Sequence, residues 1–167
     1  VHCVSDSMKD ELFRLSFSND KTSVIRTAIS DEWESVERRP ERGLLVSVGR
    51  LQWQKGYPDL LLACKILSDS NIDFHLVIIG EGPQRQELEF MIRDLNLNEK
   101  VELIGQKSHA EVRTWFASAQ ALVLSSIAEG FPNVIAEAML AQVPVVTSDC
   151  GGVTELIEDK IHAIVYQ

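Results

Sequence analysis

The sequence has 167 residues, of which 45% are hydrophobic and 25% are charged. This is enough chain for the core of one domain of ordinary size, and the composition excludes a disordered segment. The formal net charge of −9 argues against nucleic acid as a partner, because phosphate backbones bind basic surfaces. No apolar run approaches the roughly 20 residues of a membrane span, and no signal peptide is visible. Cys3, Cys64 and Cys150 lie far apart without metal-binding spacing, so we expect reduced thiols in a cytoplasmic protein.

The first 42 residues are expected to form two parts. Residues 1–4 predict a strand, Ser5 can cap a helix that runs to about Leu15, and residues 22–26 predict a second strand. The polar, charged stretch 31–42 follows and is predicted to be a linker.

From residue 43 onward, apolar runs of strand length alternate with stretches of helical spacing. The predicted strands are 44–48, 74–79, 101–104, 121–124, 143–147 and 163–165. The predicted helices are 57–67, 85–95, 108–117, 131–141 and 153–157. This alternation predicts an α/β fold with a Rossmann-like parallel sheet of about six strands and helices on both faces. Such sheets bind ligands at the carboxyl ends of their strands, so functional residues are expected in the loops that follow them.

The loop after the strand 44–48 carries two cations close together in sequence, Arg50 and Lys55, beside Gly49. The glycine allows close approach of a ligand, and the cations could neutralise a diphosphate. The alternative is two solvated surface cations beside a turn glycine. Because neighbouring like charges repel, we expect joint removal of Arg50 and Lys55 to leave stability almost unchanged or to raise it.

Two further strand-end loops are rich in glycine. Residues 80–83 form a tight turn into the next helix, which a purely structural role explains about as well as a ligand contact. Gly105, Gln106 and Lys107 follow the strand 101–104, where Gly105 could simply end the strand.

The loop 125–133 and the helix after it give the strongest signal. Pro132 suits the first turn of a helix, and the free N–H groups at that helix start can bind an anion. An acidic helix start explains Glu129 without a ligand. It does not explain Glu137, which lies in a largely apolar helix where a carboxylate needs a partner such as ligand hydroxyls. We expect both carboxylates near the same cleft.

Taken together, the segments 48–56, 80–83, 129–139 and 151–156 resemble the C-terminal, donor-binding domain of family 4 glycosyltransferases, which are retaining enzymes of GT-B fold. The resemblance implies three parts of the chain. Residues 1–30 would be the last strand–helix–strand piece of the N-terminal domain, 31–42 the linker, and 43–167 the nucleotide-sugar-binding domain, truncated before the family's C-terminal helices.

The resemblance also implies a role for each site residue. Arg50 and Lys55 would bind the donor diphosphate, and Glu129 would contact the donor sugar near the reacting carbon; these three are the expected catalytic residues. Glu137 would bind the ribose. The other implied donor-binding residues are Gly49, Gly80, Gly105, Gln106, Lys107, Gly130, Phe131, Pro132 and Asn133. No metal and no cofactor are expected beside the nucleotide-sugar donor.

The full-length enzyme would transfer a sugar with retention, with a UDP-sugar favoured, in glycan or surface polysaccharide assembly. The acceptor site and any membrane association at the inner face would belong to the N-terminal domain, so the chain alone would bind donor without transfer. Two positions depart from the family's glycines, Gln142 and a position near His162. The alternatives are a nucleotide-sugar epimerase of GT-B type, a sugar-phosphate synthase, or a non-catalytic α/β binding module.

Overall fold

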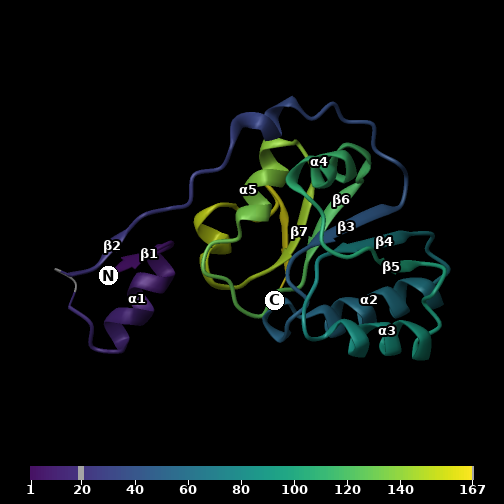
Figure 1. The fold of residues 1–167 in the computed structure, drawn as a ribbon, viewed down its shortest axis with the longest axis horizontal. Coiled ribbons are helices and arrows are strands. Elements are labelled where there is room, and N and C mark those ends of the chain that lie inside the picture. The colour runs from purple at the N-terminus through teal and green to yellow at the C-terminus, as the bar shows by residue number, and fades with distance from the viewer. Residues whose placement is uncertain (19–20, 167) are drawn as a thin grey trace.

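A six-stranded parallel sheet forms the centre of the protein (Figure 1), which is described here by a computed structural model of residues 1–18 and 21–166. The strand order is β5-β4-β3-β6-β7-β8, and every neighbouring pair is parallel. The strands are β3 (Leu44–Val48), β4 (His75–Ile79), β5 (Val101–Leu103), β6 (Ala121–Leu124), β7 (Val145–Ser148) and β8 (Ile164–Tyr166). The predicted α/β fold with a parallel sheet is confirmed. Val48 pairs with Ile79, so β3 and β4 end at the same level.

Helices cover both faces of this sheet, as the alternating sequence pattern predicts. One face carries α2 (Tyr57–Asp69) and α3 (Arg85–Asp94), and the other carries α4 (His109–Ser118) and α5 (Asn133–Leu140) (Figure 1). Each face has its own apolar core, one centred on residues such as Leu61, Leu76 and Leu88 and the other on residues such as Phe116 and Leu122. The buried β-branched and leucine side chains of the central strands contribute to both, which explains their nearly continuous apolar runs.

Residues 1–30 form a small unit beside the main sheet. Strands β1 (His2–Cys3) and β2 (Ser23–Val24) pair in parallel and flank α1 (Asp6–Arg14), at the left of Figure 1. The Ser5 hydroxyl accepts the N–H of Met8 and caps α1, as the sequence predicts. Among the described residues, 1–18 and 21–30, the strands of this unit form a sheet of their own, apart from the main sheet. Its helix contacts η4 (Gly151–Glu155), a 3-10 helix that follows β7.

The polar stretch after this unit is fastened to the main domain. Asp31–Ser35 forms the 3-10 helix η2, and its Trp33 is only 2% exposed. The Trp33 ring packs 5.4 Å from the ring of Phe116 of α4, measured between centroids. The expectation of a simple polar linker misses this anchor, because a single tryptophan in a charged run produces no periodic pattern. The division of the chain into two domains at this stretch stays a prediction.

A second fastening joins the same stretch to the C-terminal ends of two helices. The guanidinium of Arg38 donates to the carbonyl of Ala119, after α4, at 2.7 Å, and to the carbonyl of Gln142, after α5, at 3.0 Å. Gln142 adopts the left-handed conformation with φ 56°, which glycine adopts most easily at a turn after a helix. Near His162, the second position singled out in the sequence, the residue in the left-handed conformation is Lys160, with φ 60°.

Candidate functional site

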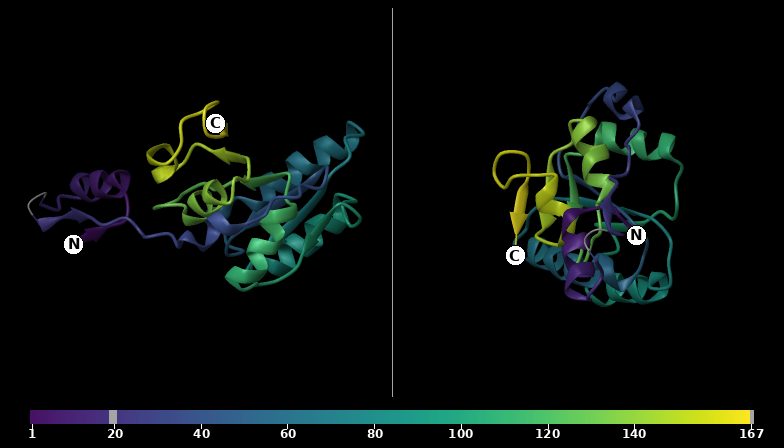
Figure 2. Two further views of the ribbon diagram at one scale, coloured as in Figure 1. Left: turned by 90° about the horizontal axis from the view of Figure 1, so that it is seen from above. Right: turned by 90° about the vertical axis from the view of Figure 1, so that its left-hand side faces the viewer.

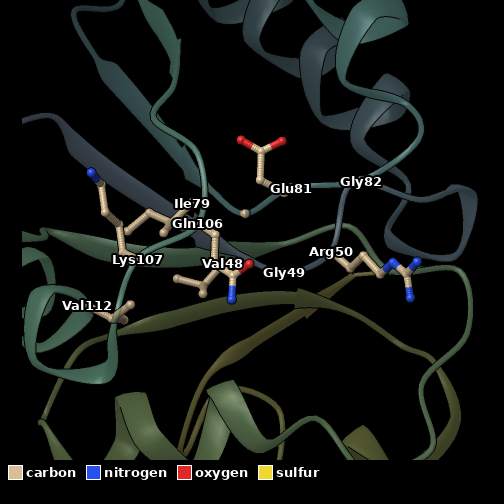
Figure 3. A pocket seen from close by; sticks show the side chains of 10 residues that line it. Val48, Gly49, Arg50, Ile79, Glu81, Gly82, Gln106, Lys107 and Val112 are labelled. Atoms are coloured by element: carbon tan, nitrogen blue, oxygen red, sulfur yellow. The ribbon is translucent and has the colours of Figure 1, made fainter.

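The strand-end loops of β3, β4 and β5 enclose a cavity of about 550 Å³ at the carboxyl edge of the sheet (Figure 3). Five of the residues that the sequence singled out line this cavity, namely Gly49, Arg50, Gly80, Gln106 and Lys107. Gly105 belongs to the same loop without lining the cavity, and the remaining lining residues are Val48, Ile79, Glu81, Gly82 and Val112. The strand-end loops chosen from the sequence therefore share one cavity on this side of the sheet.

The cavity carries positive charge at both ends. Arg50 is exposed and, within residues 1–18 and 21–166, has no carboxylate within salt-bridge distance. Lys107 lies at the opposite end in Figure 3, with its Nζ 3.8 Å from Glu111. Glu81 is bound by Arg85 at 2.8 Å, which neutralises part of the acidic charge at the rim. An anionic ligand would therefore meet Arg50 as an unpaired cation.

A partly buried ion pair between Lys55 and Glu129 joins the loop after β3 to the loop after β6. The 3-10 helix η3 (Trp53–Lys55) places Lys55 after β3, and the Glu129 loop follows β6, the neighbouring strand. The Lys55 Nζ and the Glu129 Oε1 are in direct contact, and their side chains are only 16% and 12% exposed. The Ser126 hydroxyl donates a second hydrogen bond of 2.6 Å to the same oxygen. The expectation that removing Arg50 and Lys55 leaves stability unchanged stays a prediction, but this pair gives a reason to expect a loss for Lys55, since its removal would leave a partly buried carboxylate without its cation.

Two further residues, Tyr57 and Ser125, hold the backbone around this pair, and the sequence reasoning assigned no role to them or to Ser126. The Tyr57 hydroxyl donates to the Gly49 carbonyl at 3.2 Å, and burial strongly raises the pKa of this hydroxyl. The Ser125 hydroxyl donates to the Lys55 carbonyl at 2.9 Å. Ser125 and Ser126 directly follow a buried strand at the sheet's carboxyl edge, a signal that could have indicated them.

The helix after the Glu129 loop begins slightly later than predicted. Asn133 is the first residue of α5 and Pro132 is its N-cap, whereas the predicted helix began at Phe131. Gly130 and Phe131 thus belong to the approach to α5. The side-chain oxygen of Asn133 is buried without a hydrogen-bond partner among the described residues. Predictions about what these residues bind stay predictions.

Glu137 is half-buried in α5. Burial raises the pKa of its carboxyl, and the charge of His109, at the start of α4, acts in the opposite direction. Among the described residues, Glu137 lines neither the first cavity nor the second, which is described next. A half-buried carboxylate that is not stabilised by an ion pair is an energetic cost in the unliganded protein.

A second cavity, of about 560 Å³, lies on the other side of the Glu129 loop. It opens between α1 and that loop, and its lining residues are Ser7, Met8, Asp10, Glu11, Arg14, Ala128, Glu129, Gly130 and Gly151. Glu129 thus pairs with Lys55 and also lines this second cavity together with residues of α1. Within 1–18 and 21–166, no three His, Cys, Asp or Glu side chains gather closely enough to hold a metal ion.

Comparison with known proteins identifies the family. Residues 29–167 match the family described as glycosyl transferases group 1. The chain belongs to this family. An uncharacterized glycosyltransferase of Methanocaldococcus jannaschii is 33% identical over 98% of this chain and 46% of its own length. The amylovoran biosynthesis glycosyltransferase AmsK of Erwinia amylovora is 31% identical over 95% of this chain and 41% of its own length.

Solved structures agree on the fold. The HepE protein of Anabaena, solved in complex with UDP-glucose, superimposes with a TM-score of 0.88 at 22% identity, over 100% of this chain and 49% of that one. The chain therefore spans about half the length of the relatives that it matches. In the part of the chain that the structure describes, no helix has the length and apolar character needed to cross a membrane.

Proposed function

We propose that this chain is the donor-binding half of a retaining, family 4 glycosyltransferase that uses a nucleotide-diphosphate sugar, with a UDP-sugar favoured. The observation that carries the proposal is the partly buried Lys55–Glu129 pair beside a cavity lined by strand-end glycines and Arg50. Family membership and the UDP-glucose complex of the HepE protein support the same ligand class.

The charges at this edge suit a diphosphate leaving group. A nucleoside diphosphate leaves readily only if its developing negative charge is neutralised, and fixed cations can do this without a metal. Arg50 is free to bind a phosphate. Lys55 has three N–H donors, of which Glu129 takes one, so two remain for phosphate oxygens. The ion pair also orients the ammonium before the donor arrives.

Each of the two carboxylates would bind one sugar of the donor: Glu129 the transferred sugar and Glu137 the ribose. Glu129 lies between the first cavity's loops and the second cavity, where the transferred sugar would meet its acceptor. Glu137 would accept hydrogen bonds from the ribose hydroxyls, which would compensate for the burial of its charge. Gly105, Gln106 and Lys107 would lie beside the base, and the approach to α5 from Gly130 to Asn133 would add N–H donors for phosphate.

In this proposal, the whole enzyme works in the cytoplasm in glycan or surface polysaccharide assembly. The name of the relative AmsK, an amylovoran biosynthesis glycosyltransferase, supports a biosynthetic role of this kind. The acceptor would be bound by the other half of the enzyme, which would also mediate any membrane association. The present chain would bind UDP and transfer no sugar.

Isothermal titration of UDP, UMP and uridine against the parent and Arg50→Ala tests the donor site. Losing a charge-assisted hydrogen bond costs about 1.5–3 kcal/mol, so the affinity for UDP should fall by about 10- to 150-fold. UMP should lose less and uridine least, because the lost interaction depends on phosphate charge. Arg93→Ala, on the exposed side of α3, is the matched control and should bind all three ligands like the parent.

Two results would count against this proposal. The first is a parent chain that binds none of the three ligands. The second is an Arg50→Ala variant that binds UDP as tightly as the parent does.

A further inference from the structure

Glu155 joins the two ends of the described chain through helix α1. Its Oε2 accepts the backbone N–H of Asp6 at 3.0 Å, and its Oε1 accepts that of Ser7 at 2.8 Å. These N–H groups belong to the first turn of α1, where a helix has no partners of its own for them. Arg26, after β2, adds an ion pair of 3.0 Å to Glu155 and a second contact to Asp6. The carboxylate thus caps a helix that lies almost 150 residues away in the sequence.

The Glu155 carboxylate stays ionised although it is largely buried. The side chain of Glu155 is only 16% exposed. Burial opposes ionisation, but the two N–H groups of α1 and the Arg26 guanidinium outweigh it and lower the pKa of the carboxyl. The carboxylate also meets the positive end of the helix dipole. Glu155 therefore remains charged and bound to α1 at neutral pH.

The same unit packs directly on the Glu129 loop. A Cβ added at Gly130 would lie 2.8 Å from the Met8 Cε and 3.3 Å from the Val4 Cγ2, so both side chains already touch this loop. On its other side, Gly151 has φ 50° and no room for a side chain, because an added Cβ would lie 1.9 Å from the Glu129 carbonyl oxygen. The loop is thus enclosed between the start of η4 and the α1 unit. The views in Figure 2 show the α1 unit at the end of the molecule beside this segment.

We propose that Glu155 is a positioning residue for Glu129: by holding the first turn of α1, it keeps Val4 and Met8 against Gly130 and so fixes the Glu129 carboxylate beside Lys55. Glu155 lies at the far end of η4 from Gly151, so it acts through α1 and through no contact with Glu129 itself. The structural part of this inference stands without any ligand. Its consequence for sugar binding rests on the proposed function.

Hydrogen exchange in the absence of ligand tests the structural part. The N–H groups of Ile127 and Ala128 donate to the carbonyl of Gln54, the residue before Lys55, and report how closely the loop is held. In Glu155→Ala, the amides of residues 6–8 and those of Ile127 and Ala128 should all exchange about 5- to 10-fold faster. Amides of β3 and β4 should keep the parent's rates, which shows that the fold is intact.

Matched variants separate this effect from a general loss of stability. Glu158→Ala removes an exposed glutamate three residues away and should exchange like the parent. Glu155→Gln keeps an acceptor for the α1 amides and should lie between the parent and Glu155→Ala, so it replaces the alanine variant if that chain does not fold. Faster exchange confined to residues 6–8, with Ile127 and Ala128 unchanged, would overturn the inference.

Titration with UDP and UDP-glucose tests the consequence for binding. In Glu155→Ala, affinity for UDP-glucose should fall by about 3- to 10-fold, and affinity for UDP should fall less, because Glu129 would contact the sugar directly and would act on the diphosphate only through Lys55. An equal loss for both ligands would contradict the positioning role. If the parent binds neither ligand, the proposed function fails, and the exchange experiment still decides whether Glu155 holds the loop.

Discussion

Removing the charge of Lys55 should destabilise the protein in a way that depends on Glu129. In Lys55→Met, the side chain keeps most of its length, but Glu129 retains only the hydrogen bond from Ser126. Breaking a fully buried ion pair by removing one partner costs about 3–5 kcal/mol. Because the two side chains are 16% and 12% exposed, water reaches the remaining carboxylate slightly, and we expect a loss of about 2–3 kcal/mol.

Chemical denaturation of four chains measures this coupling: the parent, Lys55→Met, Glu129→Gln and the double variant. The double variant removes both charges, so it should be more stable than Lys55→Met, with a coupling energy of about 2 kcal/mol. In thermal unfolding, about 2 kcal/mol corresponds to a lower Tm by about 4–8 °C for a chain of this size.

Lys65→Met provides the control, since Lys65 pairs with Asp69 on the exposed side of α2, where the two side chains are 36% and 62% exposed. It should cost under about 0.5 kcal/mol. If Lys55→Met costs no more than Lys65→Met, or if the double variant is the least stable of the four chains, the pair does not stabilise the site as argued here.

Three other substitutions test features of the fold. Gln142→Gly should raise the free energy of unfolding by about 1 kcal/mol, because glycine adopts the left-handed conformation without the steric cost that glutamine has; an unchanged value in urea denaturation would contradict this. Trp33→Ala should lower it by about 3–5 kcal/mol through loss of a buried aromatic ring, and a loss below about 1 kcal/mol would mean that the anchor is dispensable. Glu137→Gln should gain stability relative to the parent as pH rises. Burial raises the pKa of Glu137, so its protonated form stabilises the fold below about pH 4.3, and this contribution is lost as pH rises through the folded-state pKa. Denaturation at pH 4 and pH 7 measures the difference, which should not be constant.

The sheet could be predicted from the sequence because its signal is local. The apolar runs at 44–48 and 74–79 have no interruption, and the Ser108–Glu111 capping box marks the start of α4 from four residues alone. The strand-end rule then brought Gly49, Gly80 and Lys107 to one cavity from three separate loops.

The pairing of charges could not be predicted in the same way. Lys55 and Glu129 are 74 residues apart, and sequence spacing says nothing about which side chains meet across two neighbouring loops. Arg50 and Lys55 looked alike in sequence, yet Arg50 is exposed and Lys55 is partly buried in an ion pair with a carboxylate. Glu155 and Asp6 of α1 are 149 residues apart, and their contact depends on where the whole helix packs.

The fastening of residues 31–42 bears on how halves of related enzymes could be exchanged. A chimera joined within 36–42 would take Trp33 from one parent and the surface around Phe116 from the other, leaving an unfilled hole or a clash under α4. Residues 25–30 form no helix or strand and precede the anchor. A junction placed there would keep Trp33 and Arg38 in the same parent sequence as the residues that they contact. The packing of Trp33 on Phe116 and the hydrogen bonds of Arg38 would then be preserved in the chimera.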